Sequence, residues 1–167
     1  MANSTLVVFY SRTGHTRMAA HAIAEALDAD LEEIREPRRR RGWWRSLVDV
    51  WRERTPPILR PTRHPGDYQL VVVGSPVWAA HMSSPIRSYL RQSGPLPVAA
   101  LFVTEGGNGG GKAMEGMAEL CGRKPLATLE LTRAQLKLGE YRDRIAAFAE
   151  RLRATGRSTT QSAVAAH

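Results

Sequence analysis

Residues 5–27, TLVVFYSRTGHTRMAAHAIAEAL, decide the fold, because an apolar segment runs through a short polar turn directly into a helical pattern. Thr5–Tyr10 is rich in β-branched and aromatic residues and carries no charge, which predicts a strand covered by helices on both faces. The turn at 11–16 holds three hydroxyl side chains and a glycine. In the helix predicted at Gly14–Leu27, the first N–H groups and the positive end of the dipole would point at an anion in this turn. Phosphate fits that description.

The chain contains neither of two common nucleotide-binding loops. Neither GxGxxG nor GxxxxGK[ST] occurs, so the sequence favours neither NAD in a Rossmann loop nor ATP in a P-loop. Residues 7–23 instead match the flavodoxin signature at every specified position: apolar, apolar, aromatic, any, Ser, two residues, Gly, any, Thr, three residues, Ala, two residues, Ile. The chain therefore resembles the flavodoxin family.

In the flavodoxin family this loop binds the terminal phosphate of FMN through hydroxyls and backbone amides. The resemblance implies that the binding groups are the hydroxyls of Ser11, Thr13 and Thr16 and the amides of Arg12, Gly14 and His15. His15 departs from the Asn often found there, which matters little if the position contributes mainly its N–H. The alternative is an ordinary turn between strand and helix with incidental hydroxyls.

Five strand candidates alternate with helical segments, which predicts an α/β fold with a doubly wound, five-stranded parallel sheet and helices on both faces. The strands are expected at Thr5–Tyr10, Asp30–Arg35, Gln69–Gly74, Val98–Thr104 and Leu126–Leu131. Helices are expected at Gly14–Leu27, Ser84–Arg91, Gly111–Cys121 and Glu140–Arg153. A flavodoxin-like strand order of 2-1-3-4-5 follows, with the cofactor outside the carboxyl ends of strands 1 and 3.

The loop after the third predicted strand, GSPVWAAHMSSP at 74–85, places an aromatic side chain beside that crevice. It resembles the flavodoxin loop whose aromatic residue packs against the isoalloxazine, which implies contacts from Pro76, Val77 and Trp78. The alternative role for Trp78 is to anchor the loop in the core. Ser83 or Ser84 is the expected N-cap of the following helix.

The loop after the fourth strand, TEGGNGGGK at 104–112, has five glycines in nine residues, so its backbone can approach a ligand closely. The expected contacts to the polar edge of the flavin come from Thr104, Glu105, Gly106, Gly107 and Asn108. Electron carriers of the family often place a second aromatic here, and this loop has none before Met114. One flavin face is therefore predicted to be open unless another segment covers it, which favours an enzyme that takes hydride from a nicotinamide.

Most of the net charge of +8 lies in one segment. Residues 37–64 hold nine Arg and two acidic residues, whereas the rest of the chain is nearly neutral. Residues 42–54 predict an amphipathic helix with three Trp. One role for it is the crossover helix that packs on the sheet. The other is contact with an anionic partner, with a membrane surface, with a protein or with the phosphates of a nicotinamide dinucleotide. No RNA-binding motif accompanies this segment, which argues against nucleic acid.

At 167 residues the chain is expected to form one domain at 1–155 that includes the basic insertion 37–64, followed by a flexible tail at 156–167. The first strand leaves no room for a signal peptide, and no apolar run reaches the roughly 20 residues of a membrane span. These features predict a cytoplasmic protein. Cys121 is the only cysteine, and the histidines have no ligand spacing, so neither an internal disulfide nor a metal site is expected.

The leading hypothesis is an FMN-binding, flavodoxin-like redox protein. It transfers electrons as a carrier or acts as a quinone-reductase-like oxidoreductase, with NAD(P)H or a redox protein as its partner. The alternative is a docking module that keeps the fold, uses the helix at 42–54, and binds flavin weakly or not at all. No side chain is singled out as catalytic, and an oligomer is compatible with the sequence.

Overall fold

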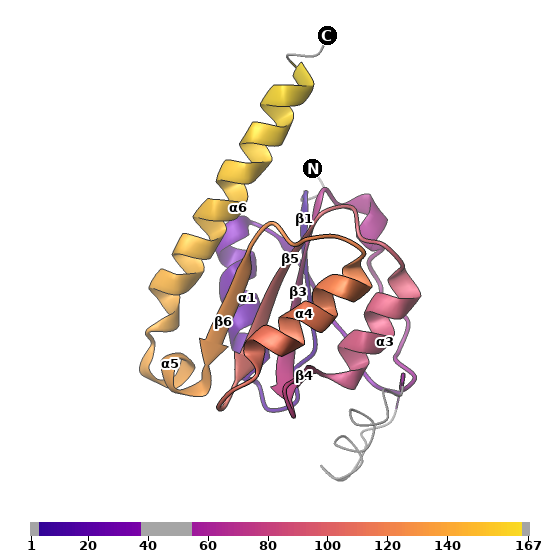
Figure 1. Ribbon diagram of the computed structural model, residues 1–167, viewed down its shortest axis with the longest axis vertical. Helices are drawn as coiled ribbons and strands as arrows, with labels where there is room; N and C mark the ends of the chain where they lie inside the picture. The colour runs from indigo at the N-terminus through magenta and orange to yellow at the C-terminus, as the bar shows by residue number, and fades with distance from the viewer. Residues whose placement is uncertain (1–3, 38–54, 165–167) are drawn as a thin grey trace.

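A parallel sheet lies at the centre of the computed structural model, which describes residues 4–37 and 55–164 (Figure 1). Its parallel strands are β1 (Thr5–Phe9), β2 (Asp30–Glu33), β3 (Leu70–Trp78), β5 (Ala99–Glu105) and β6 (Thr128–Thr132). Their order is β2-β1-β3-β5-β6, and each neighbouring pair is parallel. When only these five strands are counted, this is the predicted order 2-1-3-4-5.

A sixth strand, β4 (His81–Met82), was not predicted. It runs antiparallel to the end of β3, so the two form a hairpin. The turn residues Ala79 and Ala80 have positive φ angles of 48° and 62°, as the tight two-residue hairpin turn requires. The expectation that the third strand ends at Gly74 was wrong, because pairing with β5 and β4 carries β3 on to Trp78.

Helices cover both faces of the sheet, as the sequence predicted (Figure 1). One face is covered by α1 (His15–Leu27) and α6 (Tyr141–Val164), and the other by α3 (Ser84–Ser93) and α4 (Gly110–Cys121). A short helix, α5 (Arg133–Leu138), follows β6 directly and was missed. Its signal in the sequence is a capping box, in which Thr132 and Gln135 each bond the other's backbone.

The side chains of β1 alternate between two apolar cores, as the pleat of a strand requires. Leu6, Val8 and Tyr10, which directly follows β1, belong to the core under α3 and α4, whereas Val7 and Phe9 belong to the core under α1 and α6.

The last helix extends further than the sequence indicated. α6 continues through Gly156 to Val164 and projects past the sheet, where a flexible tail was predicted (Figure 1). Its residues include no proline, and adding a residue to an existing helix costs far less than starting one. Among the described helices, none has both the length and the apolar content to cross a membrane.

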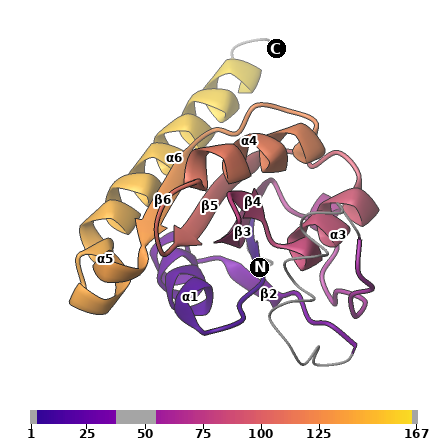
Figure 2. The same ribbon diagram turned by 60° about the horizontal axis from the view of Figure 1, so that its bottom comes forward.

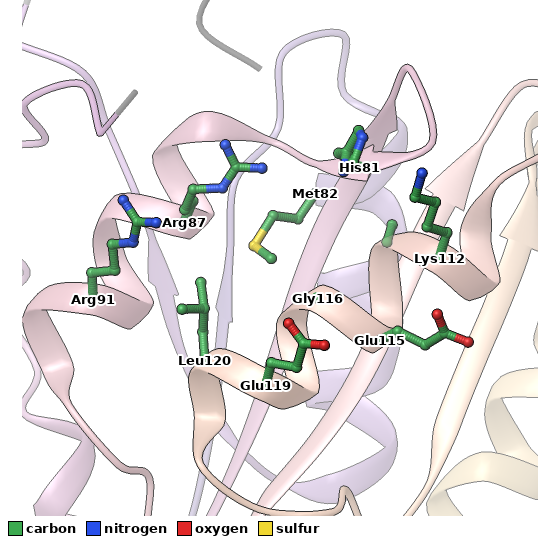
Figure 3. A pocket seen from close by; sticks show the side chains of 10 residues that line it. His81, Met82, Arg87, Arg91, Lys112, Glu115, Gly116, Glu119 and Leu120 are labelled. Atoms are coloured by element: carbon green, nitrogen blue, oxygen red, sulfur yellow. The ribbon is translucent and has the colours of Figure 1, made fainter. Parts of the chain in front are cut away.

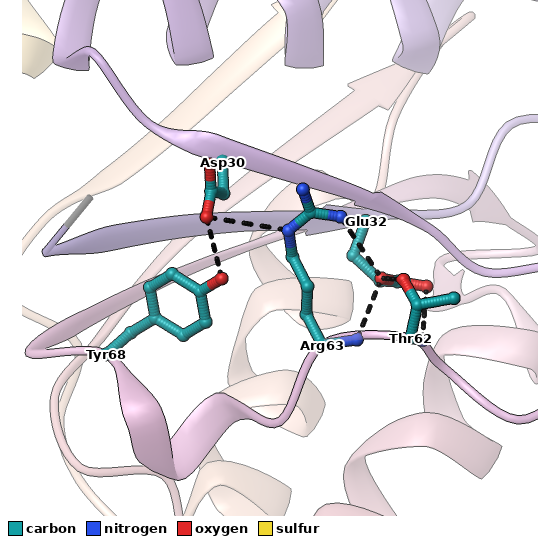
Figure 4. A network of polar contacts seen from close by, with 5 residues as sticks. All are labelled: Asp30, Glu32, Thr62, Arg63 and Tyr68. Atoms are coloured by element: carbon teal, nitrogen blue, oxygen red, sulfur yellow. Dashed lines mark hydrogen bonds and ion pairs between the residues drawn. The ribbon is translucent and has the colours of Figure 1, made fainter. Parts of the chain in front are cut away.

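The last residues of the basic insertion and the segment that follows it bond to the side chains of the edge strand β2 (Figure 4). The Glu32 carboxylate accepts hydrogen bonds from Thr62 N at 3.1 Å, Thr62 Oγ1 at 2.6 Å and Arg63 N at 3.1 Å. Asp30 accepts a hydrogen bond of 2.8 Å from Tyr68 and lies 3.5 Å from Arg63 Nε. These contacts cover an otherwise open sheet edge. The helix predicted at 42–54 lies outside the described residues.

Candidate functional site

The turn between β1 and α1 is built around Gly14, the N-cap of α1, whose φ is 95°. Gly14 N donates a hydrogen bond of 3.1 Å to Ser11 Oγ, which closes the turn. Apart from its two chain neighbours, no residue has a heavy atom within 4 Å of the position that a Cβ on Gly14 would take, so the space beside the glycine is open. The first N–H groups of a helix lack partners within the helix. Here the residues that carry these N–H groups are part of the turn at 11–16.

The predicted hydroxyls of this turn divide into two groups. Ser11 is partly exposed, and Thr13 is exposed with its Oγ1 3.0 Å from His15 Nδ1. Thr16 is only 2 % exposed, and its Oγ1 lies 2.7 Å from Thr104 Oγ1. Ser11 and Thr13 are therefore the hydroxyls that an incoming anion can reach directly, while Thr16 joins the turn to β5.

Trp78 lies at the end of β3, on the hairpin that Figure 2 shows between α1 and α4. The rings of Tyr10 and Trp78 form a T-shaped pair, with 5.7 Å between centroids and 90° between planes. Arg12 Cζ lies 5.8 Å from the Trp78 ring centroid, within the range of a cation–π contact. Trp78 is partly exposed and also packs against the core under α3 and α4, so both expected roles, platform and anchor, have some basis in its surroundings.

Tyr10 was not among the predicted site residues. Its side chain is 8 % exposed, and its hydroxyl donates a hydrogen bond of 3.0 Å to Glu36 Oε2. Burial, followed by the charge of Glu36, raises the pKa of Tyr10 far above its usual value, so this phenol stays a donor. A tyrosine at the end of an apolar strand is expected to be a core residue. Its partner Glu36 lies 26 residues away in the sequence, so no local pattern predicts their hydrogen bond.

The glycine-rich loop after β5 packs against the β3–β4 hairpin. Gly109 has a φ of 112°, and a Cβ there would lie 2.6 Å from Ala80 Cα. Glu105 is 7 % exposed, and its Oε2 accepts a hydrogen bond of 3.0 Å from Gly110 N, so one carboxyl group bridges both ends of the loop. Gly106, Gly107 and Asn108 between them are exposed.

Glu130 of β6 meets Glu105 beneath this loop. Burial, followed by a hydrogen bond and the charge of Glu130, raises the pKa of Glu105, while the Gly110 N–H opposes the shift. The Glu130 carboxyl also occupies the place where a Cβ on Gly110 would lie. The sequence pointed to Glu105 through its loop but gave no reason to pair it with Glu130.

The structure thus brings all three predicted loops to the carboxyl edge of the sheet. Arg12, Thr13, Gly106, Gly107 and Asn108 are exposed there, and Ser11, Gly14, His15, Pro76, Val77 and Trp78 are partly buried. Thr16, Thr104 and Glu105 lie beneath them as buried polar supports.

A cavity of about 280 Å³ lies beside this edge, between α3 and α4 (Figure 3). Charged side chains of both signs line it: Arg87 and Arg91 from α3, and Lys112, Glu115 and Glu119 from α4. Arg87 is 4 % exposed. The mixed charge does not select one class of ligand.

The described residues hold no cluster of His, Cys, Asp and Glu that could bind a metal ion. Cys121 is buried at the end of α4, and burial raises the pKa of its thiol to about 11. A thiol with so high a pKa is a poor nucleophile at neutral pH, and Cys121 belongs instead to the apolar core under α3 and α4.

Comparisons with known proteins point to one family. A family model described as Flavodoxin matches residues 4–141. No protein of curated function matches the chain. Among solved structures, a protein from Bacteroides uniformis ATCC 8492 is 22% identical, covers 90% of this chain and 99% of its own, and has a TM-score of 0.75.

Two further structures carry functional names. A flavoprotein from Lactobacillus acidophilus NCFM, solved in complex with FMN, is 21% identical, covers 82% of this chain and 98% of its own, and has a TM-score of 0.66. An NADH:FMN oxidoreductase in its apo form is 14% identical, covers 89% of each chain, and has a TM-score of 0.57. At these identities the similarity concerns the fold.

Proposed function

This chain belongs to the flavodoxin family, and we propose that it binds FMN at the carboxyl edge of its sheet and uses it in redox reactions. The observation that carries the proposal is the joining of two features at this edge. An open, hydroxyl-lined helix start at Gly14 adjoins a partly exposed Trp78, and Arg12 of the same turn lies over the Trp78 ring. The helix start at Gly14 suits a phosphate, and Trp78 suits a flat aromatic ring.

The turn at 11–16 fits the phosphate end of FMN. Apart from the chain neighbours of Gly14, no side chain fills the space beside this glycine, and the first N–H groups of α1 and the hydroxyls of Ser11 and Thr13 belong to the same turn. Helix starts of this kind favour anions through their N–H donors and the positive end of the dipole. Riboflavin, which lacks the phosphate, would forgo these contacts.

The ring system of FMN would lie beside Trp78 and against the exposed part of the neighbouring loop, residues 106–108. Trp78 offers an aromatic face or edge, and the glycines allow backbone groups to approach the polar edge of the flavin. When bound, the flavin supplies reversible transfer of one or two electrons, and the protein supplies binding, orientation and electrostatics.

The first test is the absorbance spectrum of the purified protein, with analysis of flavin released on denaturation. We expect bound FMN, and reconstituted apoprotein should prefer FMN to riboflavin. Thr13→Ala should weaken FMN binding by about 10- to 150-fold, because a hydrogen bond to a charged group contributes about 1.5–3 kcal/mol. Thr128→Ala is the matched control, since this exposed threonine lies at the start of β6, away from the carboxyl edge of the sheet. Equal affinity for FMN and riboflavin would contradict the phosphate site.

A nicotinamide is the electron donor that the loop at 106–109 favours. Within the described residues, this loop presents glycines and Asn108 but no aromatic ring to the proposed flavin face. Hydride transfer requires the nicotinamide to stack on such a face. Anaerobic reduction should therefore be faster with NADPH or NADH than with a flavodoxin reductase; the reverse order identifies an electron carrier.

A further inference from the structure

Two residues outside its own hairpin, Tyr10 and Arg12, contact the Trp78 ring. Ala79 and Ala80 fix the backbone of the turn, but the Trp78 side chain is partly exposed and needs contacts of its own to hold one rotamer. Two such contacts are present: the ring of Tyr10, in a T-shaped pair with 5.7 Å between centroids and 90° between planes, and the guanidinium of Arg12, 5.8 Å from the ring centroid.

Tyr10 is the more rigid of these two neighbours. Its ring is buried in the core under α3 and α4, whereas Arg12 is exposed. Its backbone N–H donates to Gly74 O at 3.3 Å, and its hydroxyl donates to Glu36 Oε2 at 3.0 Å. The backbone, the ring and the hydroxyl of Tyr10 are thus each held by a separate contact.

Glu36 reaches Tyr10 from the chain that follows β2. It comes three residues after the end of β2 and directly precedes Pro37, the first residue of the basic segment. A carboxylate is a stronger acceptor than a neutral group, so this hydrogen bond fixes the direction of the phenol better than a bond to water would. Glu36 contacts Tyr10, and Tyr10 contacts Trp78. These two contacts connect the segment after β2, the end of β1 and the β3–β4 hairpin.

We propose that Tyr10 and Glu36 are positioning residues that hold the Trp78 ring in the orientation in which it contacts the flavin. This inference rests on the proposed function, because it assigns Trp78 to the flavin platform. Neither residue needs to touch the flavin. Their effect on binding passes through the orientation of Trp78.

The first experiment needs no flavin. Apoprotein labelled with 5-fluorotryptophan gives a ¹⁹F NMR resonance for each tryptophan, and Trp78→Phe identifies the resonance of Trp78. Tyr10→Phe keeps the ring but removes the hydroxyl, and Glu36→Ala removes the acceptor. Both variants should shift or broaden the Trp78 resonance relative to the wild type. Glu36→Gln keeps an acceptor, so its Trp78 resonance should resemble that of the wild type. Tyr68→Phe is the matched control, because Tyr68 donates a similar hydrogen bond to Asp30 at 2.8 Å.

The second experiment measures the bound flavin. Tyr10→Phe and Glu36→Ala should weaken FMN binding by about two- to tenfold, the range that an oriented aromatic pair contributes. They should also change the flavin midpoint potential, which a general loss of stability would not change in protein that remains folded. Tyr68→Phe should leave both quantities unchanged.

The two experiments fail in distinguishable ways. If the wild-type protein binds no FMN, the proposed function is wrong whatever the NMR spectra show. If FMN binds but the Trp78 resonance is unchanged in Tyr10→Phe, the positioning role is wrong. It is also wrong if the resonance moves while FMN affinity and midpoint potential both stay at their wild-type values.

Discussion

The Oγ1 atoms of Thr16 and Thr104 lie 2.7 Å apart, although 88 residues separate the two threonines in the chain. Thr16 belongs to the first turn of α1 and Thr104 to the end of β5, and both side chains are buried. Their hydrogen bond connects the turn proposed to hold the phosphate with the strand that leads into the glycine-rich loop. A change in either threonine should therefore affect both loops.

Thr104→Val should lower the free energy of unfolding by about 1–3 kcal/mol, because it keeps the shape of the side chain but leaves the buried Thr16 hydroxyl without this partner. Urea denaturation of the apoprotein measures the effect. The double variant with Thr16→Val should lose less than the sum of the two single changes. Additivity to within about 0.5 kcal/mol would show that the two hydroxyls do not depend on one another.

Gly109→Ala should destabilise the protein by at least about 1–2 kcal/mol, because φ is 112° at this position and the new Cβ would lie 2.6 Å from Ala80 Cα. FMN affinity should fall as well, since the loop and the hairpin would have to separate. Gly107→Ala is the control: no atom lies within 4 Å of its Cβ position, so stability should change by less than about 0.5 kcal/mol. Equal effects of both substitutions would mean that the packing of loop on hairpin is unimportant.

Stability should depend on pH through Glu105, whose pKa is raised by burial and by Glu130. A raised pKa means that the folded state binds more protons than the unfolded state over this range. The stabilisation from protonated Glu105 should be complete below the ordinary glutamate pKa and should be lost as the pH rises through the raised value. Gly110 N–H favours the charged form, and the nearby Arg133 guanidinium lies against Gly106 on the same loop.

Glu105→Gln should flatten this dependence, because the amide imitates the protonated acid: it can donate to Glu130 and still accept from Gly110 N. Denaturation from about pH 4 to about pH 8 makes the comparison. The same slope in the variant and the wild type would assign the pH dependence to other groups.

Replacing Arg38 to Arg41 with Ser should slow reduction by an anionic donor and make its rate less sensitive to salt, because most of the net charge lies between 37 and 64. FMN affinity should stay nearly unchanged, since the proposed phosphate site lies on a different connection. Stopped-flow reduction by NADPH, NADH and a flavodoxin reductase at low and high salt identifies the donor concerned. Arg123→Ser with Lys124→Ser, two exposed basic residues elsewhere, is the control. If none of the three rates responds, the arginines do not steer these donors.

The sequence by itself determined the first strand, the turn and the helix at 5–27, the alternation of strands and helices, and the order of the parallel strands. These features follow from local patterns: β-branched runs, a glycine at the helix start, and apolar residues at helical spacing. Because parallel strands joined by helices open their loops at the carboxyl edge, the same patterns also predicted which three loops meet.

Only the tertiary structure decided which of those loop residues are exposed and what holds them. The hydrogen bonds between Thr16 and Thr104 and between Tyr10 and Glu36, and the approach of Glu130 to Glu105, join residues that lie far apart in the chain, so neither residue of a pair carries a local sign of the other. The extension of β3 to Trp78 likewise depends on its pairing with β5 and β4 rather than on its own apolar run, which ends at Gly74. Local patterns fix where a strand or helix forms, whereas burial and partner choice depend on surfaces that exist only once the sheet has assembled.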